Sequence, residues 1–158
     1  MANAKPNLSL PSNEPIKSYA PCTPERDDIK AKLQDLKDRQ IEIPIIIGGK
    51  EIRTGNMGKC VLPHDHEIVI GTYHKSGEKE VQMAIETALK AQKQWAETDW
   101  QDRASIFLGA ADILAGPQRS LLNAASMLSQ SKNIFQAEVD AACEFIDFLR
   151  FNAFYANT

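Results

Sequence analysis

Hydrophobic and polar residues alternate along the chain in two different ways. From Ser76 onward, apolar residues recur with a period near 3.6, as in amphipathic helices, whereas residues 43–74 form short apolar runs between turn residues. Upstream, Thr23-Pro24-Glu25 has the threonine cap, first-turn proline and acid that begin a helix. We therefore predict a surface helix over residues 25–38. Its narrow apolar stripe consists of Ile29, Leu33 and Leu36.

The β-rich region begins with a predicted hairpin. Residues 43–47 and 50–53 are two extended segments joined by the tight turn Gly48-Gly49. Further short strands are predicted at residues 60–62 and 68–74, on either side of a proline-containing turn.

Three amphipathic helices are predicted after residue 76. The first places these apolar residues on one face: Val81, Ala84, Ile85, Ala88, Leu89 and Trp95. The second runs from Asp99 to Gly116-Pro117, and its predicted buried stripe is Ala104, Phe107, Leu108, Ala111 and Leu114. The third begins after Pro117 and carries Leu121, Leu122, Ala125 and Leu128.

A fourth and longest helix is predicted over residues 134–156, because Asn133 and Gln136 form a capping-box pattern. One apolar face consists of Phe135, Val139, Ala142, Ile146, Leu149 and Ala153. A second face consists of Phe145, Phe148, Phe151 and Tyr155. Both faces need to be covered, so we expect contacts beyond this helix.

Composition narrows the functional class. The net charge of -3, with acids and bases interspersed, argues against a nucleic-acid partner, and no apolar run is long enough to cross a membrane. Cys22, Cys60 and Cys143 form no CxxC pair, which argues against a zinc knuckle or a disulfide framework and fits a reducing compartment. Residues 1–18 match neither a secretory signal nor an arginine-rich transit peptide, and we expect a disordered tail there.

Several short motifs have a functional and a plain structural interpretation. Gly48-Gly49 precedes a strand rather than a helix, so an ordinary turn is favoured over a nucleotide loop. His64 and His66 could chelate a metal, but no third ligand has a recognisable spacing, and an exposed loop pair is favoured. Residues 129–132 are read as an inter-helix loop rather than a phosphate contact. Nothing in the sequence activates any cysteine as a nucleophile.

The last predicted helix carries the acids Glu138, Asp140, Glu144 and Asp147. A solvated acidic face explains most of them. Glu144 is distinguished by its two flanking aromatic residues, and we single it out as the candidate site residue.

Six segments follow one another along the chain: SYAP, TPER, IPIIIGGKEIRTGNMGK, PHDHEIVIGTYHKSGEKEV, WQDRASIFLGAADILAGP and QSKNIFQAEVDAACEFIDFLRFNAFYA. In this order they closely resemble the start of the glutamate-semialdehyde (1-pyrroline-5-carboxylate) dehydrogenases of the aldehyde dehydrogenase superfamily. The resemblance runs from Tyr19 to the end of the chain. Gly109 and Ser129 depart from the family pattern, which has lysine and glycine there.

The resemblance implies an α+β fragment of an α/β aldehyde dehydrogenase fold, with an N-terminal helix, a β-hairpin region and four helices that end in a long one. Residues 19–158 would be an incomplete N-terminal part of the cofactor-binding domain. The implied activity is the NAD-dependent oxidation of L-glutamate 5-semialdehyde to L-glutamate through a thiohemiacetal on a cysteine. The implied catalytic and NAD-binding residues follow the matched region, whereas Glu144 aligns with the substrate-proximal glutamate.

We therefore expect the isolated chain to be inactive. The alternative is a truncated, non-catalytic binding module that docks on a full-length homologue. The resemblance also implies a small aldehyde substrate, a homo-oligomeric full-length form and a cytoplasmic location, with the mitochondrial matrix as the alternative.

Overall fold

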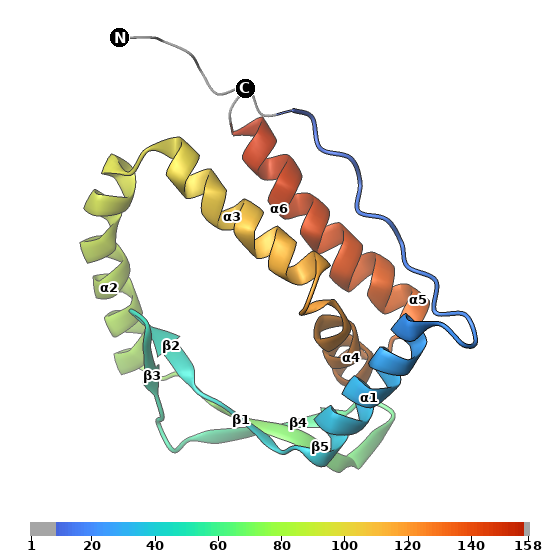
Figure 1. Ribbon diagram of the computed structural model, residues 1–158. Coiled ribbons are helices and arrows are strands. Elements are labelled where there is room, and N and C mark those ends of the chain that lie inside the picture. The colour runs from blue at the N-terminus through green and yellow to red at the C-terminus, as the bar shows by residue number, and fades with distance from the viewer. Residues whose placement is uncertain (1–8, 157–158) are drawn as a thin grey trace.

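The computed structural model describes residues 9–156 and combines helices with two small sheets (Figure 1). The helices are α1 (Pro24–Asp38), α2 (Glu78–Glu97), α3 (Trp100–Ala115), α4 (Arg119–Gln130), α5 (Ile134–Gln136) and α6 (Glu144–Tyr155), and the π-helical segment η1 (Ala137–Cys143) joins α5 to α6. The strands are β1 (Ile41–Ile43), β2 (Ile45–Ile47), β3 (Lys50–Ile52), β4 (Met57–Leu62) and β5 (Asp65–His74). This element order confirms the predicted α+β class. None of the helices within residues 9–156 is long and apolar enough to cross a membrane.

The larger sheet has the order β1-β5-β4. Strand β5 pairs antiparallel with β4 and parallel with β1, where Ile41 lies opposite Gly71. A Cβ atom on Gly71 would lie 2.8 Å from the Ile41 carbonyl oxygen, so a glycine is needed for β1 to approach. The predicted hairpin is confirmed for β2 and β3, and Gly48 and Gly49 turn the chain with φ of 59° and 74°. The prediction is wrong at Ile43, which belongs to β1 and pairs with Tyr73 of β5.

The first apolar core lies where α1 and α4 pack together over the larger sheet. Its buried members are Ile29, Leu36, Leu62, Ala124 and Leu128. Leu33 packs against this core from the side. The stripe predicted for the first helix is therefore confirmed.

The second apolar core lies between α3 and α6, which run alongside each other (Figure 1). Its fully buried members are Ala111, Ala142 and Ile146. The buried stripe predicted for α3 is wrong at Phe107, whose side chain is 45% exposed. The buried residues of α3 are the small Ala104 and Ala111.

Helix α2 forms as predicted, but none of its residues is buried within the described part of the chain. Val81, Ile85 and Leu89 are all exposed. In Figure 1, α2 stands away from the helical layer, and its contacts within the fold are mainly to β2. Its apolar face is thus open.

The long C-terminal helix is confirmed from Ile134 to Tyr155, but its middle is π-helical, which the sequence analysis missed. Asn133 accepts a hydrogen bond from Gln136 N at 2.9 Å and its own N–H donates to Gln136 Oε1, so the capping box is confirmed. The predicted apolar face is wrong at Phe135, which is 66% exposed. The second aromatic face is open, since Phe145, Phe148 and Tyr155 are exposed.

Residues 9–18, which we call the N-terminal arm, correct the expectation of a disordered tail. The arm runs along α6 in Figure 1 and makes defined hydrogen bonds to α4, η1 and α6. Asn13 Nδ2, for example, donates to Asp147 at 2.7 Å. Buried charged partners hold the arm, and these partners are distant in sequence. Residues 1–8 of the predicted tail lie outside the described residues.

Candidate functional site

A groove of about 840 Å³ lies between the N-terminal arm and the last helix, and Glu144 lies on it. The arm contributes Asn13, Glu14 and Ile16 to its wall. The helix contributes Val139, Cys143, Glu144, Asp147, Phe148, Phe151, Asn152 and Tyr155. The groove therefore combines carboxylates with aromatic rings. It includes most of the aromatic face that the sequence analysis found uncovered.

The three carboxylates of the groove differ in how they are neutralised. Glu14 bridges two guanidinium groups, those of Arg119 and Arg150. Asp147 accepts hydrogen bonds from the Glu14 N–H and from Asn13, both at 2.7 Å. Glu144 is exposed, and its carboxylate forms no hydrogen bond or ion pair with any group in residues 9–156. Within this groove, Glu144 is the acid available to a ligand.

Behind the groove lies a buried polar cluster centred on Glu138, whose side chain has no exposed surface. Its carboxylate accepts hydrogen bonds from Lys17 N at 2.8 Å and from Tyr19 Oη at 2.8 Å. Two residues of α4 also donate to it, Asn123 at 2.7 Å and Arg119 through Nε and Nη2. Arg119 is itself 2% exposed and donates to the Pro15 carbonyl at 2.7 Å.

The contacts within the cluster lower the pKa values of its two carboxyl groups, those of Glu138 and Glu14. Burial by itself would raise the pKa of Glu138, but hydrogen bonds from Arg119, Lys17 N and Tyr19 outweigh burial and lower that pKa below its ordinary value. Burial would likewise raise the pKa of Glu14, but hydrogen bonds from Arg150 and Arg119 outweigh burial and lower that pKa below its ordinary value. Both carboxyl groups are therefore ionised at neutral pH.

None of the three cysteines is shown to be an activated nucleophile. Burial, followed by the negative charge of Glu138, raises the pKa of Cys143 to about 11. Its thiol is protonated at neutral pH and lies 3.2 Å from the Arg119 guanidinium. Cys22 is exposed just before α1, and Cys60 is part of β4. Neither of these two thiols forms a hydrogen bond with a basic side chain within residues 9–156.

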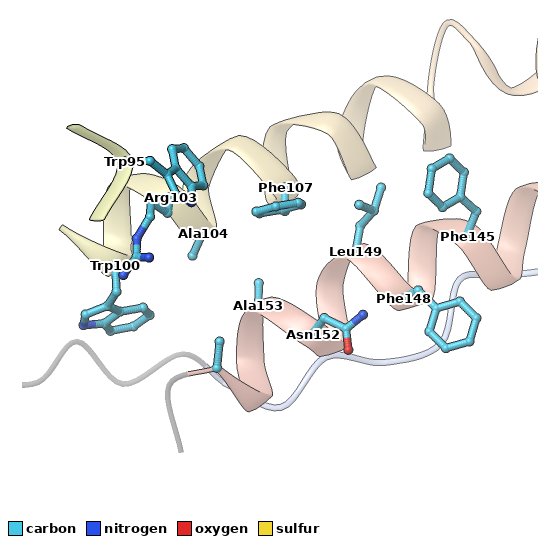
Figure 2. Close-up of a pocket in the computed structure, with 11 residues that line it drawn as sticks. Trp95, Trp100, Arg103, Ala104, Phe107, Phe145, Phe148, Leu149, Asn152 and Ala153 are labelled. Atoms are coloured by element: carbon cyan, nitrogen blue, oxygen red, sulfur yellow. The ribbon is translucent and has the colours of Figure 1, made fainter. Parts of the chain in front are cut away.

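A second cavity, of about 460 Å³, opens between α3 and α6 (Figure 2). Figure 2 shows Trp95 and Trp100 at one end and Phe145 at the other, with Phe107 and Leu149 between them. The Arg103 guanidinium lies 5.9 Å from the centre of the Trp95 ring. This cavity continues the open aromatic surface and contains no carboxylate in its wall.

The other candidate motifs have structural roles. His64 Nδ1 lies 2.8 Å from Ser131 Oγ, which ties the β4–β5 turn to the end of α4. No group of three metal-ligating residues occurs in the part of the chain that is described. The predicted loop over residues 129–132 is shorter than expected, because Ser129 belongs to the last turn of α4 and the turn begins at Ser131, with φ of 54°.

Glu144, which was singled out from the sequence, lies on the groove, whereas the arm, Arg119 and the contacts of Glu138 were not predicted. The arm has no hydrophobic periodicity, and its partners are more than 100 residues away. One signal was present. Arg119 is the only charged residue in residues 118–130, within a helix of otherwise small, apolar and neutral polar residues, which suggests a buried partner.

Comparisons with known proteins agree with this architecture. Residues 52–158 match the Aldehyde dehydrogenase family. The Delta-1-pyrroline-5-carboxylate dehydrogenase of Agaricus bisporus is 46% identical over 145 residues, which are 91% of this chain and 27% of that protein. The mitochondrial Delta-1-pyrroline-5-carboxylate dehydrogenase of Homo sapiens is 42% identical over 145 residues, covering 92% of this chain and 26% of that protein.

Solved structures give the same result. The Delta-pyrroline-5-carboxylate dehydrogenase of Mycobacterium tuberculosis, bound with NAD, matches with a TM-score of 0.94 and 41% identity over 99% of this chain and 29% of that chain. The chain thus spans about a quarter of the length of the curated relatives it matches. Since the family match covers more than half of its residues, the chain belongs to the aldehyde dehydrogenase family.

Proposed function

We propose that this chain is the N-terminal part of an NAD-dependent dehydrogenase that oxidises L-glutamate 5-semialdehyde to L-glutamate in proline degradation. Its contribution is one wall of the aldehyde-binding groove, with Glu144 as a substrate-binding residue. The observation that carries this proposal is the free carboxylate of Glu144 in a groove whose other acids are already paired. The names of the relatives support the choice of substrate.

The chemistry of the groove suits an amino-acid aldehyde. Glutamate semialdehyde carries an ammonium group at the end opposite the aldehyde, and a carboxylate without a partner in the described chain can bind it. Phe148 lies one helical turn after Glu144, and Phe151 lies almost two turns after it, so their rings border the same space. Glu144 would bind and orient the substrate without forming a bond to it.

The covalent steps require groups that we propose lie elsewhere in a longer protein. Aldehyde oxidation through a thiohemiacetal needs a thiolate nucleophile, and the protonated, buried Cys143 does not provide one. The cofactor is proposed to be NAD, in keeping with the NAD-bound Mycobacterium structure. Its binding residues are not assigned to this chain.

The test uses the purified 158-residue chain. L-glutamate, the stable product, should bind in the groove and shift the NMR signals of Glu144 and Phe148. Glu144→Gln should weaken this binding about tenfold, which corresponds to about 1.4 kcal/mol. Asp140→Asn, which neutralises an exposed acid on the same helix, is the matched control. Equal affinity of Glu144→Gln and the parent chain would contradict the proposed role.

A second measurement tests the expected inactivity of the isolated chain. Glutamate semialdehyde and NAD are incubated with the chain, and NADH is followed by its absorbance. We expect a rate equal to the buffer blank. NADH formation above the blank that scales with protein concentration would refute the assignment of the catalytic residues to other parts of a longer protein.

A second function is favoured by the open apolar surface. Val81, Ile85, Leu89, Phe145 and Phe148 are exposed on α2 and α6, which is a surface suited to protein contacts. The chain would then act as a binding module on a full-length homologue. Gel filtration of the chain mixed with a full-length relative separates the two ideas, because only the binding module predicts a stable complex.

A further inference from the structure

We infer that Glu138 and Arg119 are positioning residues of the groove: together they hold the arm and the helix that carries Glu144 in one fixed arrangement. This inference rests on the proposed function of the groove. Neither residue lines the groove itself. Their effect is exerted through the groove walls that they connect.

The first step is the arm. Glu138 accepts hydrogen bonds from Lys17 N and Tyr19 Oη, at one end of the arm and just beyond it. Arg119 donates to the Glu14 carboxylate and to the Pro15 carbonyl, in the middle of the arm. The pair therefore fixes the arm on both sides of Ile16, whose side chain lines the groove.

The second step is the helix. Glu138 lies at the second position of η1, and Glu144 is the first residue after η1. In an α-helix, residues three or four positions apart lie above one another, whereas here Glu138 Oε1 lies 3.8 Å from Cys143 Sγ, five positions later. Arg119 Nη2 contacts this same sulfur at 3.2 Å. The buried pair thus contacts both ends of the π-helical segment.

The third step is the consequence for Glu144. One additional residue in a helical turn rotates everything that follows by about 100° around the helix axis. Cys143, at the inner side of the groove, contacts the buried cluster through its sulfur, and the next residue, Glu144, lies on the groove with an exposed side chain. If the π-helical segment relaxed to an α-helix, Glu144 would turn relative to η1 and the arm. The position of the Glu144 carboxylate therefore depends on the buried pair.

The test compares three variants of the full 158-residue chain: Glu138→Gln, Arg119→Lys and the control Asp140→Asn. The first readout needs no ligand. Amide hydrogen exchange in residues 13–19 and 138–147, and trypsin cleavage after Lys17, should become at least about tenfold faster in Glu138→Gln. Exchange in α3 should stay unchanged. The same exchange and cleavage rates as in the parent chain would overturn the inference.

The second readout separates positioning from general loss of structure. L-glutamate affinity is measured for the parent chain, Glu138→Gln, Glu144→Gln and the double variant. Glu138→Gln should weaken binding about fivefold or more when Glu144 is present, and less than about twofold when Glu144 is already replaced. An equal loss in both backgrounds would overturn the inference, because Glu138 would then not act through Glu144.

Two results keep this inference separate from the proposed function. If the parent chain does not bind L-glutamate at all, the proposed function fails, and the exchange readout alone decides whether the pair fixes the arm and η1. If Glu138→Gln does not fold by circular dichroism, Arg119→Lys is used for both readouts. Lysine keeps the charge, but one ammonium group cannot replace the several directions in which the guanidinium donates.

Discussion

Replacement of Glu138 by alanine should strongly destabilise the fold. The change removes a carboxylate that accepts hydrogen bonds from four residues and leaves Arg119 and Asn123 buried without this partner. Loss of one member of a buried ion pair typically costs about 3 to 5 kcal/mol, because the other charge remains desolvated. Arg119 keeps its contacts to Glu14 and Pro15 O, so the lower end of that range is expected.

A loss of about 3 kcal/mol is large beside the total of about 5 to 15 kcal/mol that stabilises an ordinary domain. Urea unfolding followed by circular dichroism measures it. With a slope near 2 kcal/mol per molar urea, the midpoint should fall by about 1.5 M. A change in slope would instead indicate that the two-state description does not apply.

The matched control for Glu138→Ala is Asp140→Asn, on the same helix. Asp140 pairs with Lys132 at 3.1 Å, and both side chains are partly exposed, so its neutralisation should cost about 0 to 1 kcal/mol. A loss below about 1 kcal/mol for Glu138→Ala, equal to that of the control, would refute the reasoning. It would mean that the hydrogen bonds to Glu138 contribute no more to stability than a surface pair.

Three further results are expected from thermal or urea unfolding. Gly109→Ala should stabilise the chain by about 1 kcal/mol, because the helical glycine has open space at its Cβ position. Gly71→Ala should destabilise the chain, because the new Cβ atom would collide with the backbone of β1. Asn133→Ala should cost about 1 kcal/mol through loss of the capping box; an unchanged midpoint would contradict this. Because the pKa values of Glu14 and Glu138 are lowered on folding, stability should be fully present above pH 4.5 and fall as the pH drops below it, and this fall should be smaller in Glu138→Gln.

The positions of the elements could be predicted from sequence because their signals are local. The proline at the first position of α1, the two glycines of the β2–β3 turn and the capping box at the start of α5 each act within a few residues. The extent of burial was harder to predict. Helix α2 has an amphipathic pattern, yet none of its residues is buried within the described chain, because periodicity shows which face can be covered and not what covers it.

The error on the long helix has a specific physical cause. A constant period of 3.6 residues along the whole segment places Val139 and Phe135 on the same face as Ile146. The buried face instead passes through Glu138 and Ile134, one residue earlier, because η1 contains an additional residue in its turn. In the structure, Ala137 and Ala142 are both fully buried although they lie five residues apart, which is the spacing of a π-helical turn.

The candidate site was predicted in part, for a related reason. Glu144 could be found because its acid and aromatic neighbours lie on one helix, within reach of helical periodicity. The position of the arm could not be predicted from the sequence, because its contacts to the helices do not come from the burial of apolar residues. Ile16 is 57% exposed and Leu10 is 65% exposed, so the apolar residues of the arm bury little surface. Hydrogen bonds to buried charged side chains hold the arm instead of apolar contacts.

The choice of polar contacts has a consequence for the groove. An arm held by apolar side chains can slide, since such contacts have no direction, whereas hydrogen bonds from Lys17 N, from Tyr19 and to the Pro15 carbonyl fix its position residue by residue. A shift by one residue would exchange Ile16 for a neighbour in the groove wall and would break these bonds together. The same buried pair therefore costs desolvation energy and, in return, determines which arm residue faces Glu144.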